Sequence, residues 1–251
     1  MLSNNAQYME MVLSLANKYK YNQQHSMTVE RLSVNLFEQL SELHILGESE
    51  LTLLRHSALL HDIGMYISLK KHHINSAYIV YQDEELDEYP VKEREMLAVL
   101  VRNHRKGVKL SESDFSRKEY KTLSQLVAIL RIADVLDYYH QGNAVIEKVI
   151  LKNHKCIIKV SGISLDEIKE QLAKKSAFFK KAFGLKAVIL ADEEDSLLSE
   201  DNSETDEVPE NETIEDNFII ESEDDDEEDI VTETEDEVDE SDIISNLKKE
   251  I

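Results

Sequence analysis

Six side chains of the metal-ligand type recur within the first 134 residues: His25, His61, Asp62, His72, His104 and Asp134. Imidazole and carboxylate groups together suit Fe, Mn, Co, Zn or Mg, and a histidine-rich set favours the transition metals. Six candidates exceed what one tetrahedral ion requires, so we expect one or two divalent ions, with Asp62 bridging them when there are two. Such a centre acidifies water near neutral pH and polarises phosphoryl oxygens. The catalytic pair would be His61 and Asp62.

These side chains belong to apolar stripes with the helical period of 3.6 residues. The stripes run through residues 25–40, 54–61, 97–104 and 123–134. A polar group on the buried face of a helix must be hydrogen-bonded, paired or bound to a metal. Because this occurs on four separate helices, we expect one shared site inside a helical bundle. Gly64 is expected to end the helix that carries His61.

The pattern changes after Gly142, and it predicts three regions. Residues 1–142 form the helical domain, with breaks at 83–90 and 106–116. In residues 143–190, runs at 144–151 and 155–160 predict a hairpin. A helix then starts at Ser164, with capping-box spacing to Glu167, and runs to Gly184 before a strand at 187–190. The fold class is therefore mainly α, with a small ββαβ appendage and a disordered acidic tail at 191–251.

Charge is distributed very unevenly along the chain. The tail has 29 acidic residues against two lysines, whereas residues 1–190 carry a net charge of +3. We expect no direct nucleic-acid binding. A run of acidic residues is usually a solubilising, repelling tail, and the alternative is a contact with a basic protein partner or with the chain's own basic face. One cysteine, no signal peptide and no long apolar segment favour a cytoplasmic protein without membrane contact. The oligomeric state is not indicated.

The order of the candidate ligands resembles that of the HD superfamily of metal-dependent phosphohydrolases. Five strings are more similar still to the C-terminal HD-like domain of the exopolyphosphatase/pppGpp-phosphatase (Ppx/GppA) family. They are LLRHSALLHDIGMYIS (53–68), HHINSAYIV (72–80), REMLAVLVRNHRKG (94–107), LVAILRIADVLDYYH (126–140) and KKSAFFKKAFGLKAVIL (174–190). The resemblance covers about residues 1–190.

The resemblance implies an HD-type bundle in which the first histidine, the His-Asp pair and the last aspartate hold one metal. The further histidines would hold a second. Among these, His72 matches by its spacing to Ser76, and His73 is the alternative if the register slips by one.

The sequence also departs from what is known of these families. Ppx/GppA enzymes hydrolyse phosphoanhydrides in an actin-like module whose glycine-rich phosphate loops are not found in this sequence, so we do not expect exopolyphosphatase activity. Many HD hydrolases have lysine directly after HD-x-G, where this chain has Met65. The GYP signature of cyclic-di-GMP phosphodiesterases is also missing.

Basic residues beside His104 provide the expected phosphate contacts: Arg102, Arg105 and Lys106. Asp137 lies one turn beyond Asp134 and is expected to orient a ligand histidine. We assign ordinary surface or core roles to the four histidines outside these patterns: His44, His56, His140 and His154.

The function expected from these residues is metal-dependent hydrolysis of a small phosphorylated ligand, with nucleotides first. The alternative is a non-catalytic module that binds a nucleotide or polyphosphate and regulates another activity.

Overall fold

The computed structural model describes residues 5–105, 107–111 and 113–192. All of them lie in one compact unit, Met1–Glu200. The predictions about disorder and contacts of the acidic tail fall outside the described residues, except for its first two positions, Ala191 and Asp192.

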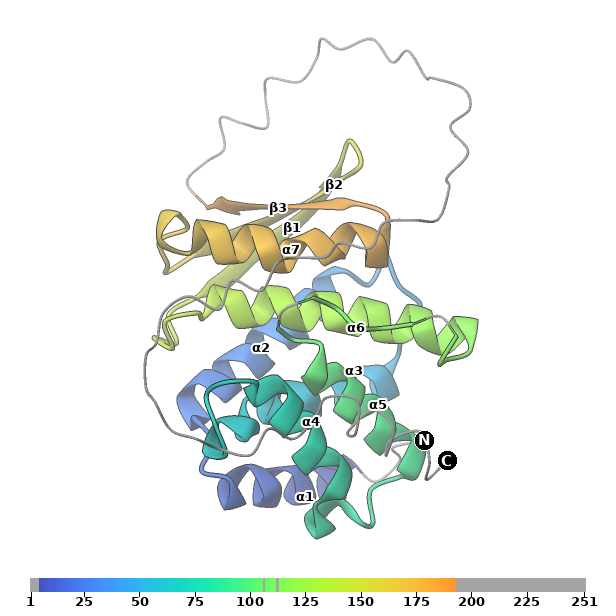
Figure 1. Cartoon of the computed structure of the whole chain (residues 1–251). Helices are drawn as coiled ribbons and strands as arrows, with labels where there is room; N and C mark the ends of the chain where they lie inside the picture. The colour runs from blue at the N-terminus through green and yellow to red at the C-terminus, as the bar shows by residue number, and fades with distance from the viewer. Residues whose placement is uncertain (1–4, 106, 112, 193–251) are drawn as a thin grey trace. The chain divides into compact units, whose positions relative to one another are not determined.

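The described chain is mainly helical and ends in a small sheet (Figure 1). The helical part consists of α1 (Asn5–Lys18), α2 (Gln23–Gln39), α3 (Glu48–Leu60), η1 (Ile63–Tyr66), α4 (His72–Gln82), η2 (Glu84–Leu86), α5 (Val91–Arg102) and α6 (Arg117–Leu136). The appendage consists of β1 (Val145–Lys152), β2 (Lys155–Ser161), η3 (Asp166–Ile168), α7 (Lys169–Phe183) and β3 (Lys186–Ala191). The predicted fold class, a helical domain followed by a ββαβ unit, is confirmed.

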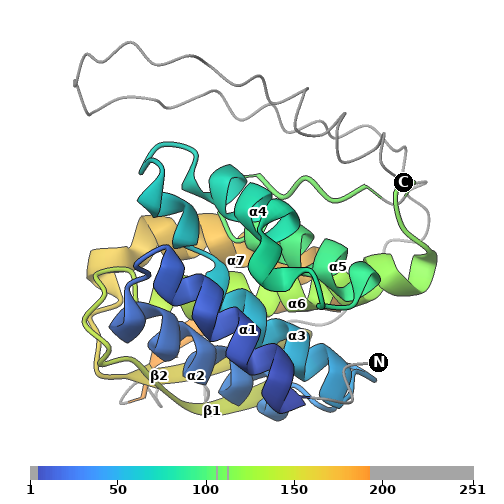
Figure 2. The same cartoon turned by 90° about the horizontal axis from the view of Figure 1, so that it is seen from below.

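Helix α6 is the centre of the bundle. Every residue from Thr122 to Leu136 is buried, as expected for a helix surrounded by other elements. It packs against α2, α3, α5 and α7, and Figure 2 shows it behind α1 and α3. A capping box fixes its start: the Ser116 hydroxyl accepts from the Glu119 N–H, and the Glu119 carboxylate accepts from the Ser116 N–H.

The three-stranded sheet has the order β1-β2-β3. Strands β1 and β2 are antiparallel and are joined at Asn153 and His154, which both adopt left-handed backbone conformations. Strand β3 then pairs in parallel with β2, which requires α7 as the crossover. In Figure 1, α7 lies between α6 and β3, so the appendage contacts the bundle through α7, and β1 also packs against α2.

Three local predictions need correction. Ser164 does not begin a helix; the turn η3 comes first, and α7 starts at Lys169. Gly64 does not end a helix in a left-handed conformation, because it lies inside η1. His104 lies in the turn after α5 rather than within that helix. Among the described residues, no helix combines the length and apolar character needed to cross a membrane.

Candidate metal centre

The six predicted ligand residues converge in the interior of the bundle, and all of them are buried. They come from five helices or the turns beside them. His25 lies in the first turn of α2, His61 and Asp62 follow α3, His72 begins α4, His104 follows α5, and Asp134 lies in the last turn of α6. The site is therefore built from the ends of helices, where the terminal turns direct the six side chains toward one another.

One group of atoms, which we call the first half-site, surrounds the inner nitrogens of His25 and His61. Their Nε2 atoms lie 3.2 Å apart. Asp134 Oδ1 lies 3.6 Å from His25 Nε2 and 3.8 Å from His61 Nε2. Asp62 Oδ2 lies 3.7 Å and 3.4 Å from the same two nitrogens. Each of the two carboxylate oxygens therefore lies within 3.8 Å of both inner nitrogens.

The other group, the second half-site, uses the opposite oxygen of Asp62. Oδ1 lies 3.3 Å from His72 Nε2 and 3.3 Å from His104 Nε2. The two Nε2 atoms are themselves 3.3 Å apart. The Asp62 carboxylate thus presents one oxygen to each half-site, which is the arrangement needed of a bridging ligand.

The spacing of these atoms fits divalent cations. Ligand nitrogens at about 2.0–2.1 Å from a tetrahedral ion lie about 3.3 Å from one another. The observed separations of 3.2 to 3.8 Å match that value. The first half-site offers four protein atoms and the second offers three, so the second leaves more room for solvent or substrate.

The outer ring nitrogens show how the imidazoles are oriented. His61 Nδ1 donates to the Ala58 carbonyl at 2.8 Å, and His104 Nδ1 donates to the Val101 carbonyl at 2.6 Å. These carbonyls lie at the ends of helices, where backbone acceptors lack helical partners. Because a carbonyl only accepts, Nδ1 carries the hydrogen in the neutral ring, and Nε2 keeps its lone pair facing inward.

The two remaining histidines also have partners at Nδ1. His72 Nδ1 lies 3.0 Å from the Leu69 carbonyl, which accepts, and 3.2 Å from Arg105 Nη1, which donates, so these two contacts favour opposite tautomers. His25 Nδ1 lies 2.9 Å from Asp137 Oδ2. Asp137 therefore lies directly behind His25, a candidate ligand, where a carboxylate can orient the ring. Inward imidazole lone pairs and two carboxylates at these distances repel one another unless a proton or a cation lies between them.

The pKa values of the two carboxyl groups follow the surrounding charges. Burial opposes ionisation of Asp62, but His61 and His104 lower its pKa below the usual range. Burial likewise opposes ionisation of Asp134, but Lys175 and the hydrogen bond from His25 hold its pKa well below the usual range. Both carboxylates are therefore ionised and available as ligands at neutral pH.

The histidines differ in their preference for a proton. Burial opposes the charge on His25. The interactions of His25 with Asp134 and Asp137 outweigh the effect of burial and raise the pKa of His25 to about 9. Burial lowers the pKa of His104 to about 4 and also lowers that of His72. The first half-site thus attracts a cation or a proton, whereas the second holds neutral imidazoles.

Lys175 is a site residue that the sequence analysis missed. Its Nζ contacts Asp134 Oδ2, the oxygen turned away from the two histidines. It lies on α7, so the appendage supplies a cation to the wall of the centre. A signal for it was present, because Lys175 shares the buried face of α7 with Leu172 and Phe179 at helical spacing.

The predicted phosphate-binding residues lie in different settings. Arg105 is exposed, and its Nη1 lies 3.2 Å from His72 Nδ1, next to the second half-site. Arg102 is partly buried, and Lys106 lies outside the described residues. His73, the alternative to His72, belongs to neither half-site, and burial lowers its pKa to about 3.

His140, to which the sequence analysis gave an ordinary role, lies against the centre. Its ring stacks on that of His25, with centroids 3.7 Å apart and planes 13° apart. One of its ring nitrogens lies within 4.8 Å of ligand atoms of His25 and Asp62. The sequence pattern held no signal for this position, because His140 lies in a turn after α6 rather than on a stripe.

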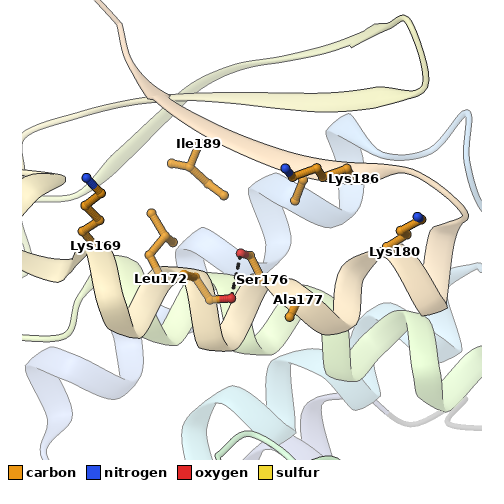
Figure 3. A pocket seen from close by; sticks show the side chains of 9 residues that line it. Lys169, Leu172, Ser176, Ala177, Lys180, Lys186 and Ile189 are labelled. Atoms are coloured by element: carbon orange, nitrogen blue, oxygen red, sulfur yellow. Dashed lines mark hydrogen bonds between the residues drawn. The ribbon is translucent and has the colours of Figure 1, made fainter. Parts of the chain in front are cut away.

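A separate hollow of about 440 Å³ lies between α7 and β3 (Figure 3). It has apolar residues such as Leu172 and Ile189 on its inner side, and the lysines Lys169, Lys180 and Lys186 around it. None of the candidate ligands lines it. On α7, Lys175 is turned to the metal centre, whereas the adjacent Ser176 lines this hollow.

The fold and the buried histidine–aspartate cluster define a helical domain with a candidate metal centre. Residues 9–175 match the family model described as Ppx/GppA phosphatase, domain III. The chain therefore belongs to the Ppx/GppA family, as its resemblance to the C-terminal part of these proteins indicated.

Curated relatives share the guanosine-5'-triphosphate,3'-diphosphate pyrophosphatase name. The chain is 31% identical over 117 residues to the protein from Pseudoalteromonas atlantica, which covers 46% of this chain and 23% of the relative. It is 30% identical over 125 residues to the protein from Aeromonas hydrophila, covering 49% and 25%. The match thus spans about a quarter of the length of these relatives.

Proposed function

We propose that this domain is a metal-dependent phosphohydrolase that acts on a small phosphorylated molecule. The observation that carries the proposal is the geometry of Asp62, whose two oxygens each face one pair of histidine nitrogens. A scaffold gains little from burying two carboxylates and four histidines, because the desolvation of charged groups is costly.

Divalent cations held by the two half-sites would polarise phosphoryl oxygens and acidify a water molecule. The residues of the chain supply fixed charges and exclude solvent. Asp62 and Asp134 hold negative charge at fixed positions, and the bundle excludes bulk solvent from the inner side. Arg105 beside the second half-site and Lys175 beside the first supply positive charge for phosphate oxygens.

Nucleotides are the first substrate class to test. The names of the curated relatives refer to a guanosine nucleotide that carries phosphoanhydride bonds. This chain matches only about a quarter of those proteins, so their activity is a hypothesis for it rather than a property of it.

The test combines metal analysis with a hydrolysis screen. Purified protein is expected to contain one to two divalent ions per chain and to release phosphate from at least one member of a panel of nucleotides and phosphorylated metabolites. Asp62→Ala should lose both ions and all turnover, because Asp62 belongs to both half-sites. Metal-loaded protein that hydrolyses nothing but melts at a higher temperature with a nucleotide would instead support the non-catalytic alternative.

A further inference from the structure

The turn after α6 holds His140 in a backbone conformation that is uncommon for a residue with a side chain. Its φ is +56°, in the left-handed region. This conformation is strained for a residue with a side chain and persists only where neighbouring groups impose it. Here the Asp137 carbonyl accepts from the His140 N–H at 2.8 Å, and Asp137 Oδ1 accepts from the Gly142 N–H at 2.7 Å. The residue that orients His25 thus also fixes the turn carrying His140.

Asn22 determines which nitrogen of the neutral His140 ring carries the hydrogen. Asn22 caps α2, and its Oδ1 accepts from the His25 N–H at 3.2 Å. This assigns the amide, so Nδ2 is the atom that lies 3.1 Å from His140 Nδ1. Because an amide nitrogen only donates, His140 Nδ1 accepts and the hydrogen is on Nε2.

This tautomer is opposite to that of three candidate ligand histidines, His25, His61 and His104. In those residues Nδ1 faces a carbonyl or a carboxylate, and Nε2 of the neutral ring keeps the lone pair that a metal requires. In His140 the lone pair is taken by Asn22, and the free group is an N–H donor. His140 is therefore unsuited to be a further ligand, although it lies at the centre.

We propose that His140 is a phosphate-contacting residue, whose Nε2–H donates a hydrogen bond to an oxygen of a phosphoryl group bound at the metal centre. This inference rests on the proposed function, because it takes the ligand to be a phosphorylated molecule. Stacking on His25 limits rotation of the ring, so the donor is held in place before the ligand arrives. His140 is only partly buried, as expected for a group that must meet a ligand.

Inorganic phosphate is the probe for the first test, with the full-length, metal-loaded protein. His140→Asn removes the ring but keeps a side chain that tolerates the left-handed backbone. We expect unchanged metal content and an affinity for phosphate about tenfold weaker, as for one lost hydrogen bond to a charged group. Loss of metal would make His140 a ligand and overturn the proposal, and unchanged phosphate affinity would overturn it as well.

The second test reads the tautomer directly. Nitrogen-15 NMR of the imidazoles should show His140 with its hydrogen on Nε2 in the wild-type protein. Asn22→Asp keeps a good helix cap but presents a carboxylate to Nδ1, so at a pH where the ring is neutral the hydrogen should move to Nδ1 and phosphate affinity should fall. Asn22→Ser, which keeps the cap without an anion, is the matched control. A wild-type ring with its hydrogen on Nδ1 would refute the proposal.

These outcomes separate the inference from the proposed function. Protein that binds phosphate but hydrolyses nothing would contradict the phosphohydrolase proposal, while the comparison of His140→Asn with wild type would still decide the role of His140. Metal-loaded protein that does not bind phosphate at all would overturn the role of His140, while the hydrolysis screen would still decide the phosphohydrolase proposal.

Discussion

The backbone N–H of Gly64 donates a hydrogen bond of 2.8 Å to the Oγ of Ser76, and this bond joins η1 to α4. The contact is so close that a Cβ on residue 64 would lie 2.2 Å from the His72 carbonyl oxygen. The separation between Asp62 and His72, and hence the second half-site, depends on the missing side chain of Gly64.

Gly64→Ala should therefore separate η1 from α4. We expect a loss of about 1–3 kcal/mol in the free energy of unfolding, since neither backbone segment can yield without strain. Metal content should fall because His72 moves away from Asp62. Urea denaturation and elemental analysis measure the two effects. Gly107→Ala is the matched control, because nothing lies within 4 Å of a Cβ at that position. Equal stability of the two variants would contradict this account of Gly64.

The candidate ligands that lie on helices were predictable from the sequence. A histidine or aspartate on an apolar helix face needs a partner when it is buried, and several such residues on different helices are most simply explained by one shared site. The stripes identified His25 and Asp134 in this way. The resemblance to known families supported His72 over His73. Lys175 could have been found by the same rule, but a lysine was not expected on a buried face.

Other features could not be predicted, because they depend on contacts between distant segments. The stacking of His140 on His25 joins residues 115 positions apart through a left-handed turn, and no periodicity describes such a contact. The close approach of Gly64 to α4 also depends on tertiary structure. From the sequence, Gly64 was interpreted as a helix end because glycine is common at that position.

The two half-sites should be separable by mutation. His72→Ala removes a nitrogen from the second half-site only, and His25→Ala removes one from the first only. Each variant is expected to retain about half of the wild-type metal content, measured by elemental analysis after dialysis. His154→Asn, an exposed position in the hairpin turn, should leave the content unchanged. Complete metal loss in both histidine variants would mean that the ions bind only as a pair.

The stability of the metal-free protein should fall as the pH rises from about 7 to about 9. The pKa of His25 is raised to about 9 in the fold, above the ordinary value of 6.5, so the folded protein binds one proton more than the unfolded chain in this range. That stabilisation is complete below pH 6.5 and is lost as the pH rises through 9. The slope is at most about 1.4 kcal/mol per pH unit.

The buried histidines whose pKa values are lowered do not change the stability of the protein between about pH 7 and pH 9. Burial lowers the pKa of His56 to about 4 and that of His73 to about 3, so their effect is complete above pH 6.5. Chemical denaturation with a chelator present, at several pH values, measures the dependence. His25→Gln should abolish it, and so should saturating metal, since a cation then replaces the proton. A flat profile for the metal-free wild type would disprove the raised pKa of His25.

Lys175 should contribute most to the stability of the protein when no metal is bound. Lys175→Met leaves the Asp134 carboxylate buried without its cationic partner, which costs about 3–5 kcal/mol for a buried pair. A divalent ion at the first half-site supplies the missing positive charge, so saturating zinc should restore much of this stability. Divalent affinity itself is expected to rise about tenfold, because one repulsive charge has gone. Phosphate should bind more weakly for the same reason.

Denaturation with and without zinc tests the role of Lys175, together with titrations of zinc and of inorganic phosphate. Lys175→Arg keeps the charge and should remain near the wild type in all three measurements. Lys180→Met changes a lysine beside the hollow between α7 and β3 and controls for the loss of a surface charge. If Lys175→Met destabilises the protein equally with and without zinc, the lysine only packs α7 against α6. If Lys175→Met destabilises only the metal-free protein, the charge of Lys175 on α7 interacts with the Asp134 carboxylate of the metal centre.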